Sequence, residues 1–262
     1  MSEKIRLGGM AMPNGVLVHG PRAWACAIRH ADGRLEVASD VKRFRAADVK
    51  QPFLRGPARL AEALALLPTV KRRLPGARLP MERPGVLAAM FGAAVAVRSV
   101  RDNTRVGPLA RELLSGALSL GPAALALRSS ELAAYHGAEH ISIGSYEHGR
   151  PREREHERCG SHLIGPLLAT SALGGVVASR APDHLQGPAR AAAQLGALAA
   201  ATEIFGWMTR NPDRRIARAL ARPGHELQHR LATAEPSREQ LEVAEAALRA
   251  CLELEHGQDR RT

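Results

Sequence analysis

Aromatic side chains are scarce in this chain, making up 3% of its 262 residues. Hydrophobic residues nevertheless reach 45%, which excludes a chain that is disordered throughout. The core must therefore consist mostly of alanine, leucine and valine, which pack helices closely but offer few large anchors. A chain of this length can bury such a core as one large domain or as two small ones.

Cysteine is also rare, and the three residues Cys26, Cys159 and Cys251 lie far apart. This number and spacing exclude a disulfide framework and fit a reducing cytosol. The N-terminal residues contain no apolar run, so we expect no secretory signal peptide.

Lysine is scarce among the basic residues, because four of the 37 are lysines and the rest are arginines. The net charge of +11 therefore reflects the coding bias of a GC-rich genome as much as a binding partner. The basic runs at 42–45, 71–73 and 214–215 are scattered and have no aromatic residues between them. This disfavours nucleic acid as a partner and fits an anionic membrane surface at least as well.

Long uncharged segments are few, and they leave membrane insertion open. Residues 159–179 carry no formal charge and are long enough to cross a hydrocarbon core of about 30 Å. Residues 113–127 and 191–202 are shorter and rich in alanine and glycine, so each would insert only marginally. The mean hydropathy of −0.18 favours a soluble protein instead.

The first 55 residues have the pattern of short β-strands, at 15–18, 24–28 and 34–37. Asp32-Gly33 is a strong hairpin turn signal between the last two. Alternation places Trp24, Cys26 and Ile28 on one face of a strand, so Cys26 is expected to be a core residue.

From residue 56 onward the pattern is helical. We expect Pro68 to interrupt the first helix and Pro122 to kink or split a later one. Residues 72–84 are expected to form a linker, and residues 150–158 a solvent-facing loop. Apolar helical segments are predicted at about 85–98, 107–128, 130–140, 163–179 and 187–210. A last helix follows Pro236, with an apolar stripe formed by Leu241, Ala244, Leu248, Cys251 and Leu252.

These patterns predict an α+β fold with a small N-terminal antiparallel sheet followed by a mostly α-helical bundle. The β-rich part would span residues 1–55 and the helical part 56–262, together forming one integrated domain. The helices are either those of a soluble bundle or membrane-embedded or membrane-associated ones.

One motif carries chemistry, His136-Gly137-Ala138-Glu139-His140. On a helix His136, Glu139 and His140 share a face, so two imidazoles can reach one divalent ion beside a carboxylate. The order H-x-x-E-H is that of the inverzincins. His148, His156, Cys159 and His162 follow within a short stretch. The alternative is a set of polar groups hydrogen-bonded inside a bundle.

Several segments resemble a known bacterial family, the YqhQ-like predicted metal-dependent enzymes, catalogued as domain of unknown function number 1385. Residues 8–21 look like its N-terminal glycine-rich motif, and Tyr135 to His140 like its Y-H-G-A-E-H-K core. Residues 146–149, 156–161 and 222–248 are similar to three further motifs. The chain departs from the family at Asn14, His19 and Ile141, which fits either a less membrane-embedded branch or one that has lost catalysis.

The resemblance implies a set of site residues. Its metal ligands would be His136, His140, His156, Cys159 and, more distantly, Glu203, while Glu139, Glu147 and Arg158 would act in catalysis. Histidine and cysteine ligands suit zinc. For Glu203, pairing with Arg210 or an exposed helix face is the alternative. His148 and His162 match no family position and are expected to be incidental.

Two functional hypotheses remain. The first is a metal-dependent enzyme, a zinc-type hydrolase at the bacterial cytoplasmic membrane, acting on an unknown substrate such as a lipid-linked compound or a peptide. The second is a noncatalytic membrane-associated module in which the same residues hold a structural metal or a polar network. A soluble cytoplasmic location is the second choice. A nucleic-acid binder is less favoured than either hypothesis.

Overall fold

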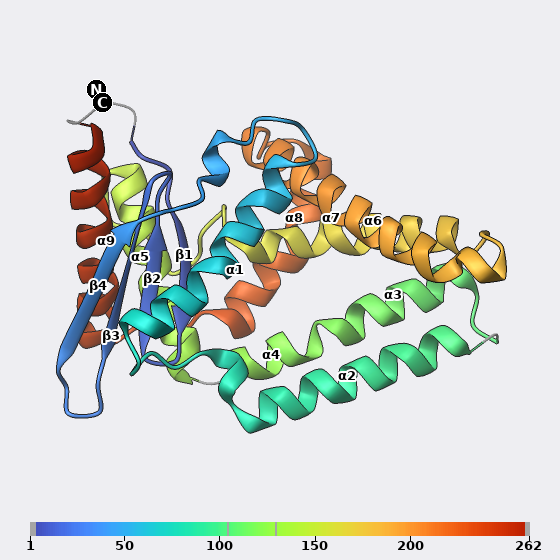
Figure 1. Cartoon of the computed structure of the whole chain (residues 1–262), viewed down its shortest axis with the longest axis horizontal. Coiled ribbons are helices and arrows are strands. Elements are labelled where there is room, and N and C mark those ends of the chain that lie inside the picture. Colours follow the sequence, from blue (N-terminus) through green and yellow to red (C-terminus); the bar gives the residue numbers. More distant parts are fainter. Residues whose placement is uncertain (1–3, 104, 129, 260–262) are drawn as a thin grey trace.

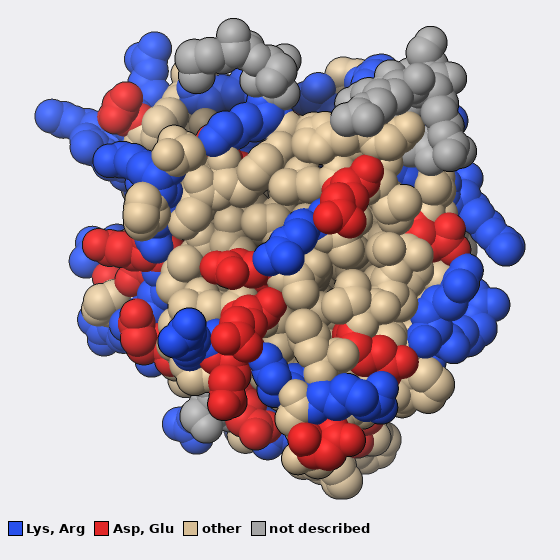
Figure 2. All heavy atoms as spheres, turned by 90° about the vertical axis from the view of Figure 1, so that its left-hand side faces the viewer, with Lys and Arg blue, Asp and Glu red and all other residues tan. Residues whose placement is uncertain are grey.

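The computed structural model describes residues 4–103, 105–128 and 130–259, which adopt an α+β fold. Four antiparallel strands form a meander in the order β1 (Gly8–Met12), β2 (Gly15–His19), β3 (Ala23–Arg29) and β4 (Leu35–Val41). The sheet lies at the left of Figure 1, and that side faces the viewer in Figure 2. The predicted fold class is thus confirmed, although β1 had no clear strand signal.

The hairpin between β3 and β4 turns at the predicted position. Gly33 has a φ of 85°, which glycine adopts without steric cost. One face of the sheet carries Trp24, Cys26 and Ile28, as the alternation predicted, and packs on α1 (Arg55–Arg73) through Leu66 and Val70. Cys26 is therefore a core residue.

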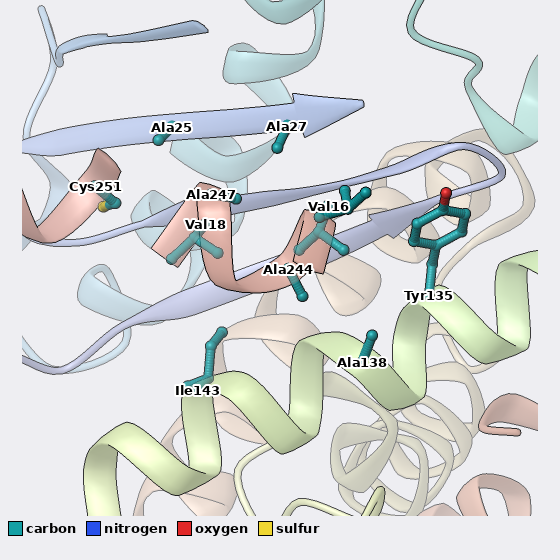
Figure 3. Packing of buried hydrophobic residues seen from close by; sticks show 11 residues of the cluster. Val16, Val18, Ala25, Ala27, Tyr135, Ala138, Ile143, Ala244, Ala247 and Cys251 are labelled. Atoms are coloured by element: carbon teal, nitrogen blue, oxygen red, sulfur yellow. The ribbon is translucent and has the colours of Figure 1, made fainter. Parts of the chain in front are cut away.

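Two helices far apart in sequence, α5 (Ser130–His148) and α9 (Arg238–Asp259), cover the opposite face of the sheet. Figure 3 shows Val16, Val18, Ala25 and Ala27 of the strands meeting residues of both helices. The helices contribute Tyr135, Ala138, Ile143, Val243, Ala244, Ala247 and Cys251. The N-terminal strands and the last helix thus share one core, and α5 is fixed against the sheet.

Five helices form an arm that extends away from the sheet in Figure 1. They are α2 (Pro84–Asp102), α3 (Pro108–Ser119), α4 (Gly121–Leu127), α6 (Ile164–Ala178) and α7 (Gln186–Arg210). The predicted split at Pro122 is present, because α3 ends just before it and α4 begins. Short 3₁₀ helices occur at Ala46–Asp48, Pro80–Glu82, Gly160–Leu163 and Asp183–Leu185.

One helix had not been predicted, α8 (Arg215–Leu227), which continues into a π-helical turn at Gln228–Ala232. The pair Pro223-Gly224 resembles a turn signal, yet both residues lie within α8. Gly224 is needed there because a Cβ would lie 2.4 Å from the carbonyl oxygen of Ser161. The glycine is therefore required by the close contact of α8 with the backbone at Ser161, which no local sequence pattern predicts.

Three local expectations need correction. Pro68 does not end α1, since the helix runs through it and is anchored on the sheet by Leu66 and Val70. Residues 72–84 are not a free linker, because Leu74 and Ala77 are buried against the sheet. The loop 150–158 does not simply face solvent, because His156 within it is buried. In each case burial of apolar or histidine side chains outweighs the local preference.

Two helices among the described residues are long and apolar enough to cross a membrane, Pro84–Asp102 and Gly160–Ala178. The second corresponds to the predicted segment 159–179. Core helices of soluble proteins pass the same test, but several apolar side chains of the arm are strongly exposed. Phe91 of α2 is 76% exposed and Leu195 of α7 is 70% exposed. The arm therefore presents apolar surface that nothing in the described part of the chain covers.

Candidate metal centre

Helix α5 presents His136 and His140 one turn apart, while Tyr135 and Ala138 of the same helix pack against the sheet. The two rings lie with their centroids 4.3 Å apart. The loop after α5 then brings Cys159 to the same point, directly before the 3₁₀ helix Gly160–Leu163. The three residues thus converge because two adjacent segments of the chain fold back on each other.

The potential ligand atoms of His136, His140 and Cys159 all lie within 4.8 Å of one another. The His136 Nε2 and Cys159 Sγ atoms are 3.5 Å apart. Tetrahedral zinc, with Zn–N of about 2.0 Å and Zn–S of about 2.3 Å, separates its ligand atoms by about 3.3–3.6 Å. The three side chains fit one such ion after a small contraction.

Backbone carbonyl groups fix the orientation of both imidazoles. His136 Nδ1 lies 2.8 Å from the carbonyl oxygen of Ala232, and His140 Nδ1 lies 2.7 Å from that of Arg154. Because a carbonyl only accepts, each Nδ1 carries the proton and donates it, which leaves each Nε2 with a free lone pair. His140 Nε2 is buried without a hydrogen-bond partner, as expected for a nitrogen atom whose lone pair binds a metal ion.

The protonation states of these groups also suit metal binding. Burial lowers the pKa of His140, which keeps its imidazole neutral. Burial by itself would raise the pKa of the Cys159 thiol, but hydrogen bonding to the sulfur, to which Ser161 contributes, lowers it. Neutral imidazole and thiolate are the forms that bind zinc.

Glu139 lies beside this group rather than in it. Burial raises the pKa of its carboxyl group. The side chain fits against β1 at Gly9, where a Cβ would lie 2.2 Å from Glu139 Oε1. Gly9 therefore makes room for a carboxyl group that is poised to hold a proton next to the three candidate ligands.

A second polar group adjoins the first and contains three other predicted residues. Glu147 lies with one carboxylate oxygen 3.1 Å from His156 Nε2, and its other oxygen forms an ion pair with Arg158. The His156 ring centroid is 5.6 Å from that of His140. The structure thus places His156 as the partner of Glu147, next to the converging ligand atoms of His136, His140 and Cys159.

A cleft of about 470 Å³ opens beside this second group. Its lining includes His156 and Gln228, together with Arg150 and Arg152 and the acidic Glu153, Glu155 and Glu157. A polar ligand bound in this cleft would therefore contact His156, whose ring lies next to that of His140.

Sequence reasoning missed Gln228, which is fully buried. Its side-chain oxygen accepts a hydrogen bond from the His156 N–H, and its amide nitrogen donates to the His156 carbonyl and to Ser161 Oγ. It begins the π-helical turn that also supplies the Ala232 carbonyl bonded to His136. A π-helical turn is a frequent mark of functional sites, but the sequence gives no signal for it.

The remaining candidates lie elsewhere. Glu203 on α7 pairs with Arg55 and accepts a hydrogen bond from the Phe53 N–H, so the structure does not bring it to the three converging ligand atoms. His148 pairs with Glu157 in an exposed position. His162, expected to be incidental, contacts the amide of Gln228 through Nδ1 at 3.2 Å.

Comparison with known proteins supports a family but no activity. No curated protein and no solved structure matches the chain. A family model described as "Protein of unknown function (DUF1385)" matches residues 129–254, which include α5, the converging ligands, Gln228 and most of α9. The glycine-rich motif at residues 8–21 lies outside the match. Residues 129–254 thus match the model of the DUF1385 family, whose members are described as proteins of unknown function.

Proposed function

We propose that this protein is a metal-dependent hydrolase whose ion, zinc, is held by His136, His140 and Cys159. The observation that carries the proposal is the convergence of three ligand atoms, with no fourth protein ligand in that group among the described residues. Structural zinc sites are closed by four protein ligands, whereas catalytic sites use three and leave one position open. Three ligands therefore favour the catalytic type.

The neighbouring residues supply the remaining chemistry. A zinc ion lowers the pKa of water and polarises a carbonyl or phosphoryl oxygen. Glu139, buried beside the ligands, is placed to take up and return a proton. Glu147 is oriented by Arg158 and holds His156 at the edge of the cleft. His156 would bind a polar group of the substrate or pass a proton to it.

The proposed location is the bacterial cytoplasmic membrane. The support is the apolar surface of the arm, on which Phe91 and Leu195 are exposed, and the two helices long enough to span a bilayer. Arg98 and Arg180 near the far end of the arm would meet anionic headgroups. A lipid-linked compound or a peptide bound in the polar cleft is the substrate class that suits this setting. A soluble protein in the cytoplasm is the alternative.

Metal analysis tests the proposal directly. The purified protein is expected to contain about one zinc ion per chain, as implied by one three-ligand group. The double variant His136→Ala/His140→Ala should lose it. The matched control His184→Ala/His256→Ala, which removes two exposed histidines, should keep it. Full metal retention in the first variant would exclude this centre.

The alternative of a noncatalytic module predicts a different result on chelation. A metal that only holds the fold together should, on removal, unfold the segment around the 3₁₀ helix Gly160–Leu163. A catalytic ion bound by three residues on a sheet-supported helix should leave the fold intact. Circular dichroism with and without chelator distinguishes the two. Loss of helicity on chelation would favour the structural role.

A further inference from the structure

The outer edge of β4 has no partner strand among the described residues, because the sheet order is β1-β2-β3-β4. The His30 N–H donates to the Arg34 carbonyl and the Lys42 N–H to the Arg22 carbonyl. Bonding in an antiparallel ladder alternates, so the even-numbered residues of β4 face β3. The backbone groups of the odd-numbered residues therefore point outward, and among the described residues only the Val41 N–H of this set has a hydrogen-bond partner, the side chain of Asp40.

The side chains of these odd-numbered residues form an uncharged row on the α9 side of the sheet. Leu35, Val37 and Val41 are 39%, 41% and 39% exposed, and Ser39 lies between them. In Figure 2, uncharged residues make up most of the centre of the side that carries β4 and α9, with a few charged side chains across it. The charged residues of β4, Glu36 and Asp40, lie on the other face and are paired with His30 and Arg73.

Exposed edge strands are normally protected by charged side chains, lysine above all, by proline or by a bulge. The two charged side chains of β4, Glu36 and Asp40, are held by His30 and Arg73 of the same chain. The segment Leu35–Val41 has no lysine and no proline, and all seven of its residues pair in register with β3. An unprotected apolar edge of this length is typical of a strand that pairs with another. We propose that the partner is a second copy of this chain, whose β4 adds antiparallel to the first about a two-fold axis at Val37.

Charge decides the register. An axis at Ala38 would place Glu36 opposite Asp40 of the second copy, which are like charges. An axis at Ser39 would place Glu36 opposite Lys42, whose ammonium group is already buried against Glu62. The first alternative places like charges opposite each other, and the second places Glu36 opposite a lysine that is already held by Glu62.

An axis at Val37 avoids both problems. It places Arg34 opposite Asp40 of the second copy and Glu36 opposite Ala38, while Val37 meets its own copy. The two sheets then become one continuous sheet of eight strands. The arm lies away from this edge in Figure 1, and α5 packs on β1 and β2 at the other side of the sheet, so both clefts and both arms stay free.

Cysteine cross-linking tests the contact and its register. Facing residues of a hydrogen-bonded antiparallel pair have Cα atoms about 5.5 Å apart, within disulfide range. Val37→Cys should therefore form a covalent dimer on mild oxidation of the full-length protein. Ser39→Cys is the matched control, because its two copies would lie four residues out of register, about 13 Å apart. Wild-type protein, oxidised in the same way, shows whether the native residues Cys26, Cys159 and Cys251 form cross-links by themselves.

The outcomes separate the alternatives. Cross-linking of Val37→Cys without that of Ser39→Cys supports the proposal. Cross-linking of Ser39→Cys, or of neither, overturns it. In analytical ultracentrifugation, Val37→Lys should shift the dimer to monomer, whereas Leu195→Lys on the arm should not. A wild-type protein that sediments as a monomer, or a Val37→Lys variant that stays dimeric, also contradicts it. None of these results depends on metal binding.

Discussion

Two backbone carbonyl groups, those of Ala232 and Arg154, decide which nitrogen of each candidate ligand is free. Such a carbonyl cannot be removed by substitution, so the two ring orientations depend on where the main chain passes. At the residue scale, the candidate centre is therefore sensitive to side chains that position the loop 150–158 and the turn Gln228–Ala232. His136, His140 and Cys159 could be proposed from sequence, but these supporting groups could not.

Glu139 gives a pH-dependent prediction. Because its pKa is raised by burial, the folded protein retains a proton that the unfolded chain releases near its ordinary pKa of about 4.3. Stability therefore falls as the pH rises through the unfolded pKa towards the folded one. Glutamine cannot ionise, so Glu139→Gln removes this loss of stability. In the absence of metal, the variant should have a higher Tm than wild type at about pH 8, and the difference should shrink towards about pH 4.

Thermal unfolding of the chelated proteins across this pH range checks the prediction. Glu253→Gln, which changes an exposed carboxylate on α9, should leave the pH profile unchanged. A Glu139→Gln variant that is less stable than wild type at the alkaline end would contradict a raised pKa.

Gln228→Ala should destabilise the fold by about 2–3 kcal/mol, because it leaves the buried N–H and carbonyl of His156 without partners. The zinc content should fall as well, since the displaced loop carries His156 and leads into Cys159. Chemical denaturation and metal analysis measure the two effects. Gln51→Ala, at an exposed position, is the control. Unchanged stability of the Gln228 variant would show that the loop holds without it.

At the scale of elements, glycines set the distances on which the centre depends. A Cβ at Gly137 would lie 2.3 Å from the carbonyl oxygen of Ala234, and backbone cannot yield as a flexible side chain can. The adjoining backbone bond from the Ala234 N–H to the Ala133 carbonyl ties α5 to the segment after the π-helical turn. Close approach of these two segments is what brings the Ala232 carbonyl to His136.

Gly137→Ala should therefore weaken zinc binding by about tenfold or more, the range found when groups that orient metal ligands are lost. Competition with a chromogenic chelator measures the affinity. Gly196→Ala on α7 is the matched control, because nothing lies within 4 Å of its added Cβ, and it should leave the affinity unchanged. Equal affinities for the two variants would contradict the role given to the α5 contact.

On the scale of the whole molecule, the chain has a body built on the sheet and an arm with exposed apolar side chains (Figure 1). The candidate centre belongs to the body, because α5 packs on the sheet. The arm joins it through the 3₁₀ helix Gly160–Leu163, which leads directly into α6. This arrangement would place the cleft close to the surface of a membrane in which the arm is embedded.

Membrane binding by the arm is testable with Phe91→Asp/Leu195→Asp. A charge at the centre of a membrane helix costs about 2.5–3.5 kcal/mol, so this double variant should lose most of its membrane association. Flotation with vesicles of anionic and zwitterionic phospholipid measures it. Phe44→Asp, which changes an exposed aromatic residue of the body, should float like wild type. A wild-type protein that fails to float would disprove the proposed location.

Local patterns predicted much of the fold. The Asp32-Gly33 turn, the face formed by Trp24, Cys26 and Ile28, and the split near Pro122 are all present, because each depends on neighbours in sequence. Pro68 and α8 were misjudged because packing contacts outweigh local preference there. The same division holds at the candidate centre, where helical spacing places two histidines together and cannot exclude Glu203.

By itself, the sequence determined most of the elements, though not α8, and the shared helix face of His136 and His140, because a helix repeats every few residues whatever surrounds it. Only the tertiary structure decided that Cys159 joins them, that Glu147 pairs with His156, and that Gln228 supports the loop. These contacts join segments separated by turns and loops whose paths no local pattern specifies. They are fixed by the burial of α5 and α9 on one sheet, a property of the whole chain.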